Sequence, residues 1–281
     1  MDDCHLFTLS SGDGTKLAAR HWEARDPLAT LALVHGFGEH SGRYSDFGMS
    51  LAARGVDVFA VDLRGHGRSE GKRGVVSDYA DFRADLHALL SHVASARRTG
   101  STTLFGHSMG GGVVLDFGMN GAGAKDNRWG VSRVIASAPL LAPADPVPKP
   151  LEMLARLMAR IAPGASMKNA ISGAQISTLP DEQARYEQDP HNHDRLGFRL
   201  ALDLIGRGAE MMAEAERWPT DLPLLVLHAT GDQLTDFAAS KDFALRAGAD
   251  FRSFDGAEHE LHNDTTRAAI YDAVERFAKA A

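Results

Sequence analysis

The chain has 281 residues, of which 44% are hydrophobic and 24% charged, and this composition excludes a disordered chain. Its 30 Lys and Arg against 37 Asp and Glu give a net charge of −7, which disfavours a nucleic-acid partner because phosphate binding needs a basic surface. The single cysteine, Cys4, excludes an internal disulfide and a cysteine-built metal site. Length alone leaves open one domain or two.

The N-terminus is acidic where a signal peptide would be basic, and no long apolar segment follows it. The apolar runs, such as residues 56–63, are interrupted by Asp and are far shorter than the ~20 residues that span a bilayer. A lone thiol also fits a reducing compartment. We therefore expect a soluble, cytoplasmic protein.

Short apolar runs alternate with helical patterns, which predicts parallel strands joined by crossover helices. The first two segments, 5–10 and 16–22, flank a Gly-Asp-Gly turn and are predicted to form an antiparallel hairpin at the sheet edge. Further along the chain, central strands are predicted at 31–35, 56–62, 102–107, 131–137, 224–228 and 251–254. Between them, the clearest helical stripe is Tyr79, Phe82, Leu86, Leu89 and Val93, which we expect to lie against the sheet.

The alternation breaks at residues 139–218, where Pro and Gly cluster and helices are predicted without an intervening strand. We interpret this segment as an inserted helical cap on a core formed by 1–138 and 219–281. Pro150 is expected in the first turn of a helix that stops before Pro163. Its apolar stripe either packs onto the core or forms a lip over an acyl-chain tunnel or at a membrane surface: Leu151, Leu154, Leu157, Met158 and Ile161.

Residues 106–110, Gly-His-Ser-Met-Gly, match the nucleophile elbow Gly-x-Ser-x-Gly. A predicted strand leads into the match and a small-residue helix, 110–119, leads out, which is the context that the motif requires. The turn strains the serine backbone and brings neighbouring backbones close, so side chains at the flanking glycines would collide. Ser108 is therefore the candidate nucleophile.

A serine nucleophile needs a histidine base and a carboxylate that fixes the imidazole tautomer. In folds that carry the nucleophile elbow, the catalytic residues follow along the chain in the order Ser, acid, His. Asp232 and His259 fit this order, because each follows a predicted late strand. Asp236 is an alternative acid, although we expect it to cap the next helix, and His262 is an alternative base. The spacing of the two histidines is one residue too short for the zinc motif His-Glu-x-x-His, so no metal is predicted.

The segment His-Gly-Phe-Gly at 35–38 follows the third predicted strand, where hydrolases of this fold place a backbone donor of the oxyanion hole. The N–H groups of Phe37 and Met109 are therefore expected to stabilise a tetrahedral oxyanion. The sequence contains no phosphate-binding loop and no dinucleotide fingerprint, so no cofactor is predicted.

Four segments of the chain form a specific combination: HGFGEHSGRY at 35–44, DLRGHGRSEGKRG at 62–74, GHSMGGG at 106–112 and GAEHELHND at 256–264. Together they resemble the monoacylglycerol lipases of the α/β hydrolase superfamily, and the similarity covers nearly the whole chain. The resemblance implies a mostly parallel eight-stranded sheet flanked by helices, with an inserted helical cap. It also implies the triad Ser108, Asp232 and His259, and the oxyanion donors Phe37 and Met109.

In that family a polar pocket beside the triad holds the glycerol hydroxyls, and the matching positions here are Glu39, Arg43, Tyr186 and His262. The alternative is that Glu39 and Arg43 form a local ion pair and that Tyr186 packs within the cap. A further family loop, which we interpret as structural, contains Asp62, Arg64 and His66.

Two departures from the family pattern stand out. Ala229 replaces the usual Gly at the head of the acid loop, where Gly231 is a candidate source of the missing flexibility. The cap is the least similar part, and its His191 and His193 are expected to be solvent-exposed.

The resulting hypothesis is a serine hydrolase that cleaves monoacylglycerols to glycerol and fatty acid through an acyl-enzyme on Ser108, with transient membrane contact through the cap. Two alternatives keep the chemistry, namely a lysophospholipase and a short-chain carboxylesterase. A third, from another class, is a non-catalytic small-molecule receptor with this fold.

Overall fold

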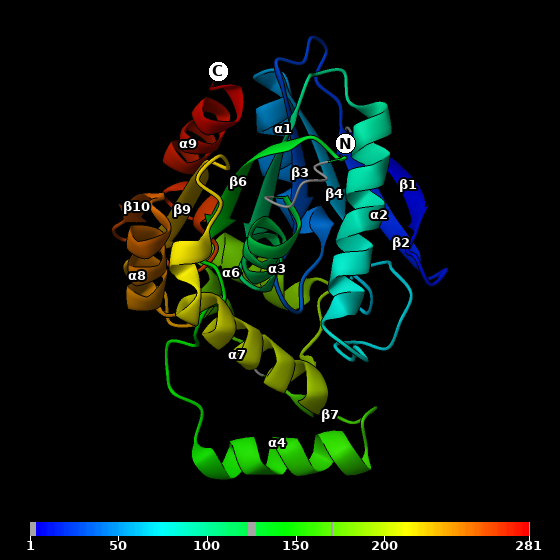
Figure 1. The fold of residues 1–281 in the computed structure, drawn as a ribbon, viewed down its shortest axis with the longest axis vertical. Coiled ribbons are helices and arrows are strands. Elements are labelled where there is room, and N and C mark those ends of the chain that lie inside the picture. The colour runs from blue at the N-terminus through cyan, green and yellow to red at the C-terminus, as the bar shows by residue number, and fades with distance from the viewer. Residues whose placement is uncertain (1–3, 123–127, 170, 281) are drawn as a thin grey trace.

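The computed structural model describes residues 4–122, 128–169 and 171–280. An eight-stranded sheet forms its centre, with strand order β1-β2-β4-β3-β5-β6-β9-β10 (Figure 1). The first two strands form the predicted edge hairpin, β2 pairs antiparallel with β4, and all later pairs are parallel. The strands are β1 (His5–Ser10), β2 (Lys16–Trp22), β3 (Ala29–Val34), β4 (Val56–Val61), β5 (Thr102–His107), β6 (Val131–Ser137), β9 (Leu224–Ala229) and β10 (Asp250–Phe254). The prediction of a mostly parallel α/β sheet is confirmed.

Helices cover both faces of the sheet, and each face has its own apolar cluster. Helices α2 (Ala80–Ala96), α3 (Met109–Phe117) and α8 (Phe237–Ala247) pack on one face. Helices α1 (Ser45–Ala53) and α9 (Arg267–Lys279) pack on the other. All five residues of the stripe predicted between 79 and 93 are buried, as expected for a helix that lies against the sheet.

The segment between β6 and β9 lies at one end of the sheet, in the lower part of Figure 1. It contains helices α4 (Lys149–Ile161), α5 (Gly173–Ile176), α6 (Pro180–Gln188) and α7 (Phe198–Ala213). Contrary to the prediction, it also holds two strands, β7 (Ser166–Lys168) and β8 (Arg195–Gly197), which pair antiparallel. Each strand has three residues, so neither is long enough to show an alternating pattern in the sequence.

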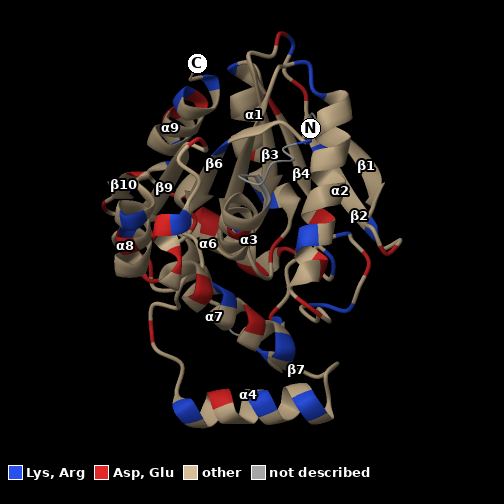
Figure 2. Ribbon diagram, in the orientation of Figure 1, with Lys and Arg blue, Asp and Glu red and all other residues tan. Residues whose placement is uncertain are grey.

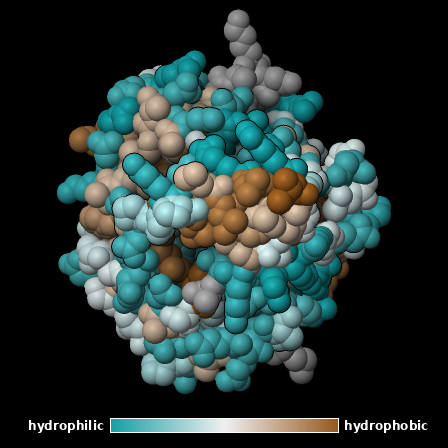
Figure 3. Space-filling view, turned by 90° about the horizontal axis from the view of Figure 1, so that it is seen from below, coloured by the Kyte–Doolittle hydropathy of each residue, from teal (hydrophilic) through white to brown (hydrophobic). Residues whose placement is uncertain are grey.

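Helix α4 is the outermost element of that segment (Figures 1 and 2). As predicted, it has Pro150 in its first turn and ends before Pro163. Ala155 is its one buried residue, so packing of the apolar stripe onto the core is excluded. Five apolar side chains are 39–70% exposed and form a continuous band, bordered by hydrophilic side chains, in Figure 3: Leu151, Met153, Leu154, Leu157 and Ile161. Among the described residues, no helix combines the length and hydropathy that a membrane span requires.

Candidate active site

Ser108 lies on a sharp turn between the end of β5 and the start of α3. Its backbone has φ 53° and ψ −117°, a conformation that L residues rarely adopt. A Cβ at Gly106 would lie 2.2 Å from the carbonyl oxygen of Gly110, and a Cβ at Gly110 would lie 2.3 Å from that of Val34. The sequence interpretation of both glycines is therefore confirmed: the turn has no space for a side chain at position 106 or at position 110.

The surroundings of Ser108 leave hydrogen-bonding groups free. Within the part of the chain that the structure describes, neither the Ser108 hydroxyl nor the N–H groups of Phe37 and Met109 make a hydrogen bond to another residue. Gly36 lies directly against Ser108, since a Cβ on Gly36 would be 3.1 Å from the serine Cβ. The two N–H donors and the hydroxyl are thus available to a bound substrate.

The turn that contains Phe37 is held from two sides. The Gly36 N–H donates to Glu39 Oε1 at 2.5 Å. From the segment between β6 and β9, the His193 N–H donates to the Gly38 carbonyl at 2.8 Å. These contacts fix the turn in place without using the Phe37 N–H.

Asp232 follows β9, and its carboxylate is completely buried. Its Oδ2 accepts from His259 Nδ1 at 2.7 Å, from the Thr235 hydroxyl at 2.8 Å and lies 3.0 Å from His228 Nε2. Its Oδ1 accepts from the N–H groups of Leu234 and Thr235 at 2.8 and 3.1 Å. Burial by itself raises the pKa of Asp232, but the imidazoles of His259 and His228 outweigh it and hold the pKa well below its ordinary value.

His259 is the imidazole that both contacts Asp232 and lines the cavity beside Ser108. Burial lowers the pKa of His259, but the Asp232 carboxylate outweighs burial, so the pKa is raised. An imidazole with a carboxylate on Nδ1 presents Nε2 as a proton acceptor, which is the arrangement that general-base catalysis needs.

The two alternatives for these roles are occupied elsewhere. Asp236 caps α8, as predicted, by accepting from the N–H groups of Ala238 and Ala239. His262 stacks on Tyr44 with ring centroids 4.3 Å apart, and burial lowers its pKa to about 4. Neither residue forms the imidazole–carboxylate pair.

Sequence reasoning missed His228 and Thr235. His228 is at the end of β9, four residues before Asp232. The sequence pattern predicted only a buried strand at this position. A polar residue at a completely buried strand end is the signal that identifies it, because buried polar groups require partners.

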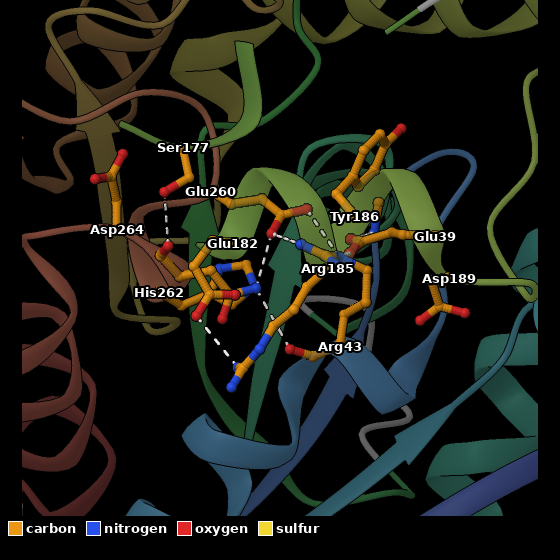
Figure 4. Close-up of polar contacts among 12 residues, drawn as sticks. Glu39, Arg43, Ser177, Glu182, Arg185, Tyr186, Asp189, Glu260, His262 and Asp264 are labelled. Carbon is orange, nitrogen blue, oxygen red and sulfur yellow. Dashed lines mark hydrogen bonds and ion pairs between the residues drawn. The ribbon is translucent and has the colours of Figure 1, made fainter. Parts of the chain in front are cut away.

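The polar residues expected to bind glycerol, namely Glu39, Arg43, Tyr186 and His262, come together in one buried cluster beside the triad (Figure 4). Glu39 and Arg43 do form a local ion pair, with Oε2 and Nε 3.5 Å apart. The shorter contact of Arg43, however, is with Glu260, which the sequence analysis did not single out: Nη2 and Oε2 are 2.5 Å apart. Tyr186 lies with its ring 5.1 Å from the Arg43 guanidinium carbon.

A cavity of about 310 Å³ opens at Ser108, and its walls are mainly apolar. Its polar end contains Ser108, His259, Glu39 and Glu260. Its apolar end is built from the segment between β6 and β9: Leu151, Ala155, Ile171, Leu204 and Ile205. Such a cavity fits a ligand with a long apolar part and a small polar part.

Three expectations about neighbouring residues have clear outcomes. His191 and His193 are only partly exposed, because His193 packs against Phe37 and His191 against His40, and the prediction of exposed side chains is wrong. Ala229 is buried within β9 and needs no special backbone conformation. Gly231 is required for close approach rather than flexibility, since a Cβ there would lie 2.7 Å from the Ala257 carbonyl oxygen.

The loop that was interpreted as structural makes the contacts of a structural loop. Asp62 accepts from the N–H groups of Ser41 and Arg68 at 2.8 and 2.9 Å. Arg64 pairs with the buried Asp85 at 2.7 Å. His66 is completely buried. No cluster of His, Cys, Asp and Glu that could hold a metal ion occurs among residues 4–122, 128–169 and 171–280.

Comparisons with known proteins show which families this chain is similar to. Residues 25–266 match the family described as serine aminopeptidase, S33. The monoacylglycerol lipase of Mycolicibacterium smegmatis is 33% identical over 89% of this chain and 87% of its own length. The human monoglyceride lipase is 29% identical over 91% of this chain and 84% of its own length.

Solved structures show the same relationship. The monoacylglycerol lipase of Paleococcus ferrophilus superposes with a TM-score of 0.82 at 29% identity, covering 94% of this chain and 98% of that one. A soluble variant of the Saccharomyces cerevisiae monoglyceride lipase, in complex with a substrate analogue, has a TM-score of 0.83 at 23% identity and covers 96% of this chain and 93% of that one. Because the Saccharomyces cerevisiae protein is only 23% identical to this chain, its similarity shows a shared fold alone.

Proposed function

Because the chain belongs to the serine aminopeptidase S33 family of α/β hydrolases and is similar to monoacylglycerol lipases, we propose that it hydrolyses monoacylglycerols to glycerol and fatty acid. The chain is a serine ester hydrolase of this family. The observation that carries the proposal is that the strained Ser108 and His259, whose imidazole is paired with the buried Asp232, both line one mainly apolar cavity.

In the proposed reaction, Ser108 Oγ attacks the ester carbonyl carbon while His259 Nε2 takes the hydroxyl proton. Asp232 holds the imidazole through Nδ1 and stabilises the imidazolium. The N–H groups of Phe37 and Met109 bind the oxyanion. His259 then protonates the leaving glycerol oxygen, and a water molecule, activated by the same imidazole, releases the fatty acid from the acyl-enzyme.

We propose that the two ends of the cavity bind the two parts of the substrate. The acyl chain lies along the apolar wall, which needs no directed contacts. The glycerol hydroxyls lie at the polar end, next to the cluster of Glu39, Arg43, Tyr186 and His262. A small polyol is recognised by several converging hydrogen-bonding groups, and Glu39 and Tyr186 are the members of this cluster that line the cavity and can contact the polyol directly.

We propose that residues 139–218 form a cap on a core of 1–138 and 219–281. The support is that Ser108 precedes this segment in sequence and Asp232 and His259 follow it, while the segment supplies most of the apolar cavity wall. The arrangement lets the cap determine which acyl chains enter.

We further propose that α4 makes peripheral contact with lipid surfaces. Its exposed apolar band lies on a helix that carries Lys149, Arg160 and an Arg156–Glu152 ion pair, and the net positive charge suits the interface of an anionic membrane (Figures 2 and 3). Co-sedimentation with vesicles of phosphatidylcholine and phosphatidylglycerol tests this. Leu154→Ser with Leu157→Ser should release the protein from the vesicles, whereas Leu245→Ser, on α8 and 80% exposed, should not; equal binding by all three proteins contradicts the proposal.

Steady-state kinetics on an ester panel test the substrate. Long-chain monoacylglycerols should be hydrolysed with a higher kcat/KM than a short-chain p-nitrophenyl ester or a lysophospholipid, and Ser108→Ala should abolish all three activities. A much higher kcat/KM for the short-chain ester would favour a carboxylesterase, and binding without turnover would favour a receptor. Either result contradicts the proposed function.

A further inference from the structure

Two carboxylates and one guanidinium are buried together at the polar end of the cavity (Figure 4). The side chains of Glu39, Arg43 and Glu260 are each only 2–3% exposed. Glu39 and Arg43 belong to the segment after β3, and Glu260 follows His259 in the loop after β10. Three buried charges that sum to −1 are costly, and the cost falls if one carboxyl group carries a proton.

The contacts of Arg43 are unequal. Its Nε and Nη2 donate to the two carboxylate oxygens of Glu260 at 3.2 and 2.5 Å, a bidentate pair. Asn263 Nδ2 adds a donor to Glu260 Oε2 at 2.7 Å. Glu39 has only the longer contact, 3.5 Å from its Oε2 to the Arg43 Nε. Glu260 is therefore the carboxylate whose charge Arg43 balances.

Glu260 is also fixed by its backbone. Its N–H donates to the Ile176 carbonyl at 2.8 Å, at the end of α5. The preceding His259 N–H donates to the Gln175 carbonyl at 3.3 Å. These two bonds fix the backbone from which the Glu260 side chain reaches Arg43, in the same loop as the imidazole.

The two oxygens of Glu39 have different surroundings. Oε1 accepts from the Gly36 N–H at 2.5 Å and from the Tyr44 hydroxyl at 2.8 Å. Oε2 is buried and has no hydrogen-bond partner among the described residues. Glu39 lines the cavity. A proton on Oε2 would therefore be free to donate to an oxygen of the substrate.

We propose that Glu260 is a positioning residue of the reaction: by holding Arg43 in a bidentate pair, it keeps Glu39 as a neutral acid that donates a hydrogen bond from Oε2 to a hydroxyl oxygen on the alcohol side of the substrate. The inference rests on the proposed function, because it concerns the same polar end of the cavity. It assigns Glu260 a role in selecting esters of polyhydroxy alcohols over esters of alcohols without free hydroxyls.

The electrostatics agree with this geometry. Burial and the nearby Glu260 charge raise the pKa of Glu39 well above its usual range. Burial also acts on Glu260, but Arg43 outweighs it and lowers that pKa. The titratable and charged groups around Glu39 come from its own segment, from the end of β5, from α6 and from the loop after β10: Arg43, Tyr44, His107, Tyr186, His259, Glu260 and His262.

Kinetics with matched esters test the proposal. The quantity measured is the ratio of kcat/KM for a monoacylglycerol to kcat/KM for the methyl ester of the same fatty acid, between about pH 5 and pH 9. For the wild-type chain the ratio should stay constant below the raised pKa of Glu39 and fall above it. In Glu260→Gln, Arg43 can pair with Glu39, so the fall should occur at lower pH and the ratio at neutral pH should drop about tenfold, the size of one hydrogen bond.

Two further variants separate positioning from a general structural role. Glu39→Gln keeps a neutral donor at all pH values, so Glu39→Gln/Glu260→Gln should regain the ratio that Glu260→Gln loses, without pH dependence. Glu258→Gln removes a charge from the same loop without touching Arg43 and should titrate like the wild type. A wild-type ratio in Glu260→Gln, or no rescue by Glu39→Gln, overturns the proposal.

Infrared difference spectroscopy distinguishes failure of this inference from failure of the proposed function, because it needs no substrate. The wild-type spectrum minus that of Glu39→Gln should contain the C=O stretch of a protonated carboxylic acid at neutral pH. Glu260→Gln should lose that band. If the band is present but monoacylglycerols are not hydrolysed, the proposed function is wrong and the proton assignment stands; if the band is absent, the assignment is wrong.

Discussion

The strained backbone of Ser108 predicts that removing its Cβ stabilises the protein. At φ 53° and ψ −117° a residue with a Cβ is strained, and such a conformation costs of order 1–3 kcal/mol. The Ser108 hydroxyl makes no hydrogen bond to a described residue, so Ser108→Ala removes the nucleophile and keeps the strain. We expect Ser108→Ala to unfold with a free energy within ~0.5 kcal/mol of wild type.

Ser108→Gly removes both the nucleophile and the strain. Against the relief of strain stands the larger conformational entropy of an unfolded glycine, about 0.5–1 kcal/mol. The net expectation is that Ser108→Gly is more stable than Ser108→Ala by up to about 2.5 kcal/mol. For a chain of this length that difference raises the Tm by up to about 4 °C.

Urea unfolding followed by circular dichroism, together with differential scanning calorimetry on both variants, measures this difference. Both variants should lack esterase activity, so a difference in stability between them cannot come from bound reaction product. If Ser108→Gly is less stable than Ser108→Ala, the elbow stores no strain at this residue and the account of the turn is wrong.

Further predictions concern the acid, a buried histidine and the elbow glycine. Asp232→Asn should lower kcat roughly 10⁴-fold, because the imidazole is no longer held in the required tautomer. Asp236→Ala should leave kcat unchanged and lower the stability by about 1 kcal/mol, because a helix cap is lost. Kinetics and urea titration measure both effects, and the opposite pattern would show that Asp236 is the catalytic acid and Asp232 is not. Burial lowers the pKa of His262 from 6.5 to about 4, so the unfolded chain binds a proton that the folded chain does not. The free energy of unfolding should fall as pH drops from about 6.5 to about 4, by up to ~3 kcal/mol from this residue, and the fall should be shallower in His262→Gln; parallel pH curves would argue against it. Gly110→Ala should lower the free energy of unfolding by more than about 3 kcal/mol. In contrast, Gly12→Ala, with no atom within 4 Å of the added Cβ, should change it by less than ~0.5 kcal/mol. Similar urea midpoints for the two variants would contradict the explanation that position 110 has no space for a Cβ.

The parts of the fold that the sequence predicted are those with strong local signals. The edge hairpin is marked by a Gly-Asp-Gly turn, and the structure pairs His5–Ser10 with Lys16–Trp22. The elbow is marked by Gly106 and Gly110, where neighbouring backbone leaves no space for a side chain. The predicted helix ends of α4 depended on Pro150 and Pro163, which act on the backbone directly.

The parts that the sequence did not predict depend on contacts between distant segments. The strands β7 and β8 exist because residues 166–168 meet residues 195–197, and three-residue strands carry no periodicity. His193 was predicted to be solvent-exposed, yet its ring packs on Phe37, with the two ring centroids 5.5 Å apart. The apolar stripe of α4 fixed a helical face but not its burial, because periodicity is the same whether that face meets a core or a lipid surface.

The candidate site shows the same division. Ser108, Asp232 and His259 were identifiable because each follows a predicted strand in a fixed order. His228 and Glu260 were not, since their roles arise from partners that the fold supplies: Asp232 for His228 at 3.0 Å, and Arg43 for Glu260 at 2.5 Å. Residues that act through a partner have no motif of their own in a single sequence.

Labelling with a fluorophosphonate, followed by mass spectrometry of the intact protein and its peptides, tests most directly that Ser108 is the nucleophile of an ester hydrolase. We predict one phosphonyl adduct per chain, located on Ser108, absent in Ser108→Ala and formed much more slowly in His259→Ala. An adduct on another residue, or equal labelling of wild type and Ser108→Ala, would contradict it.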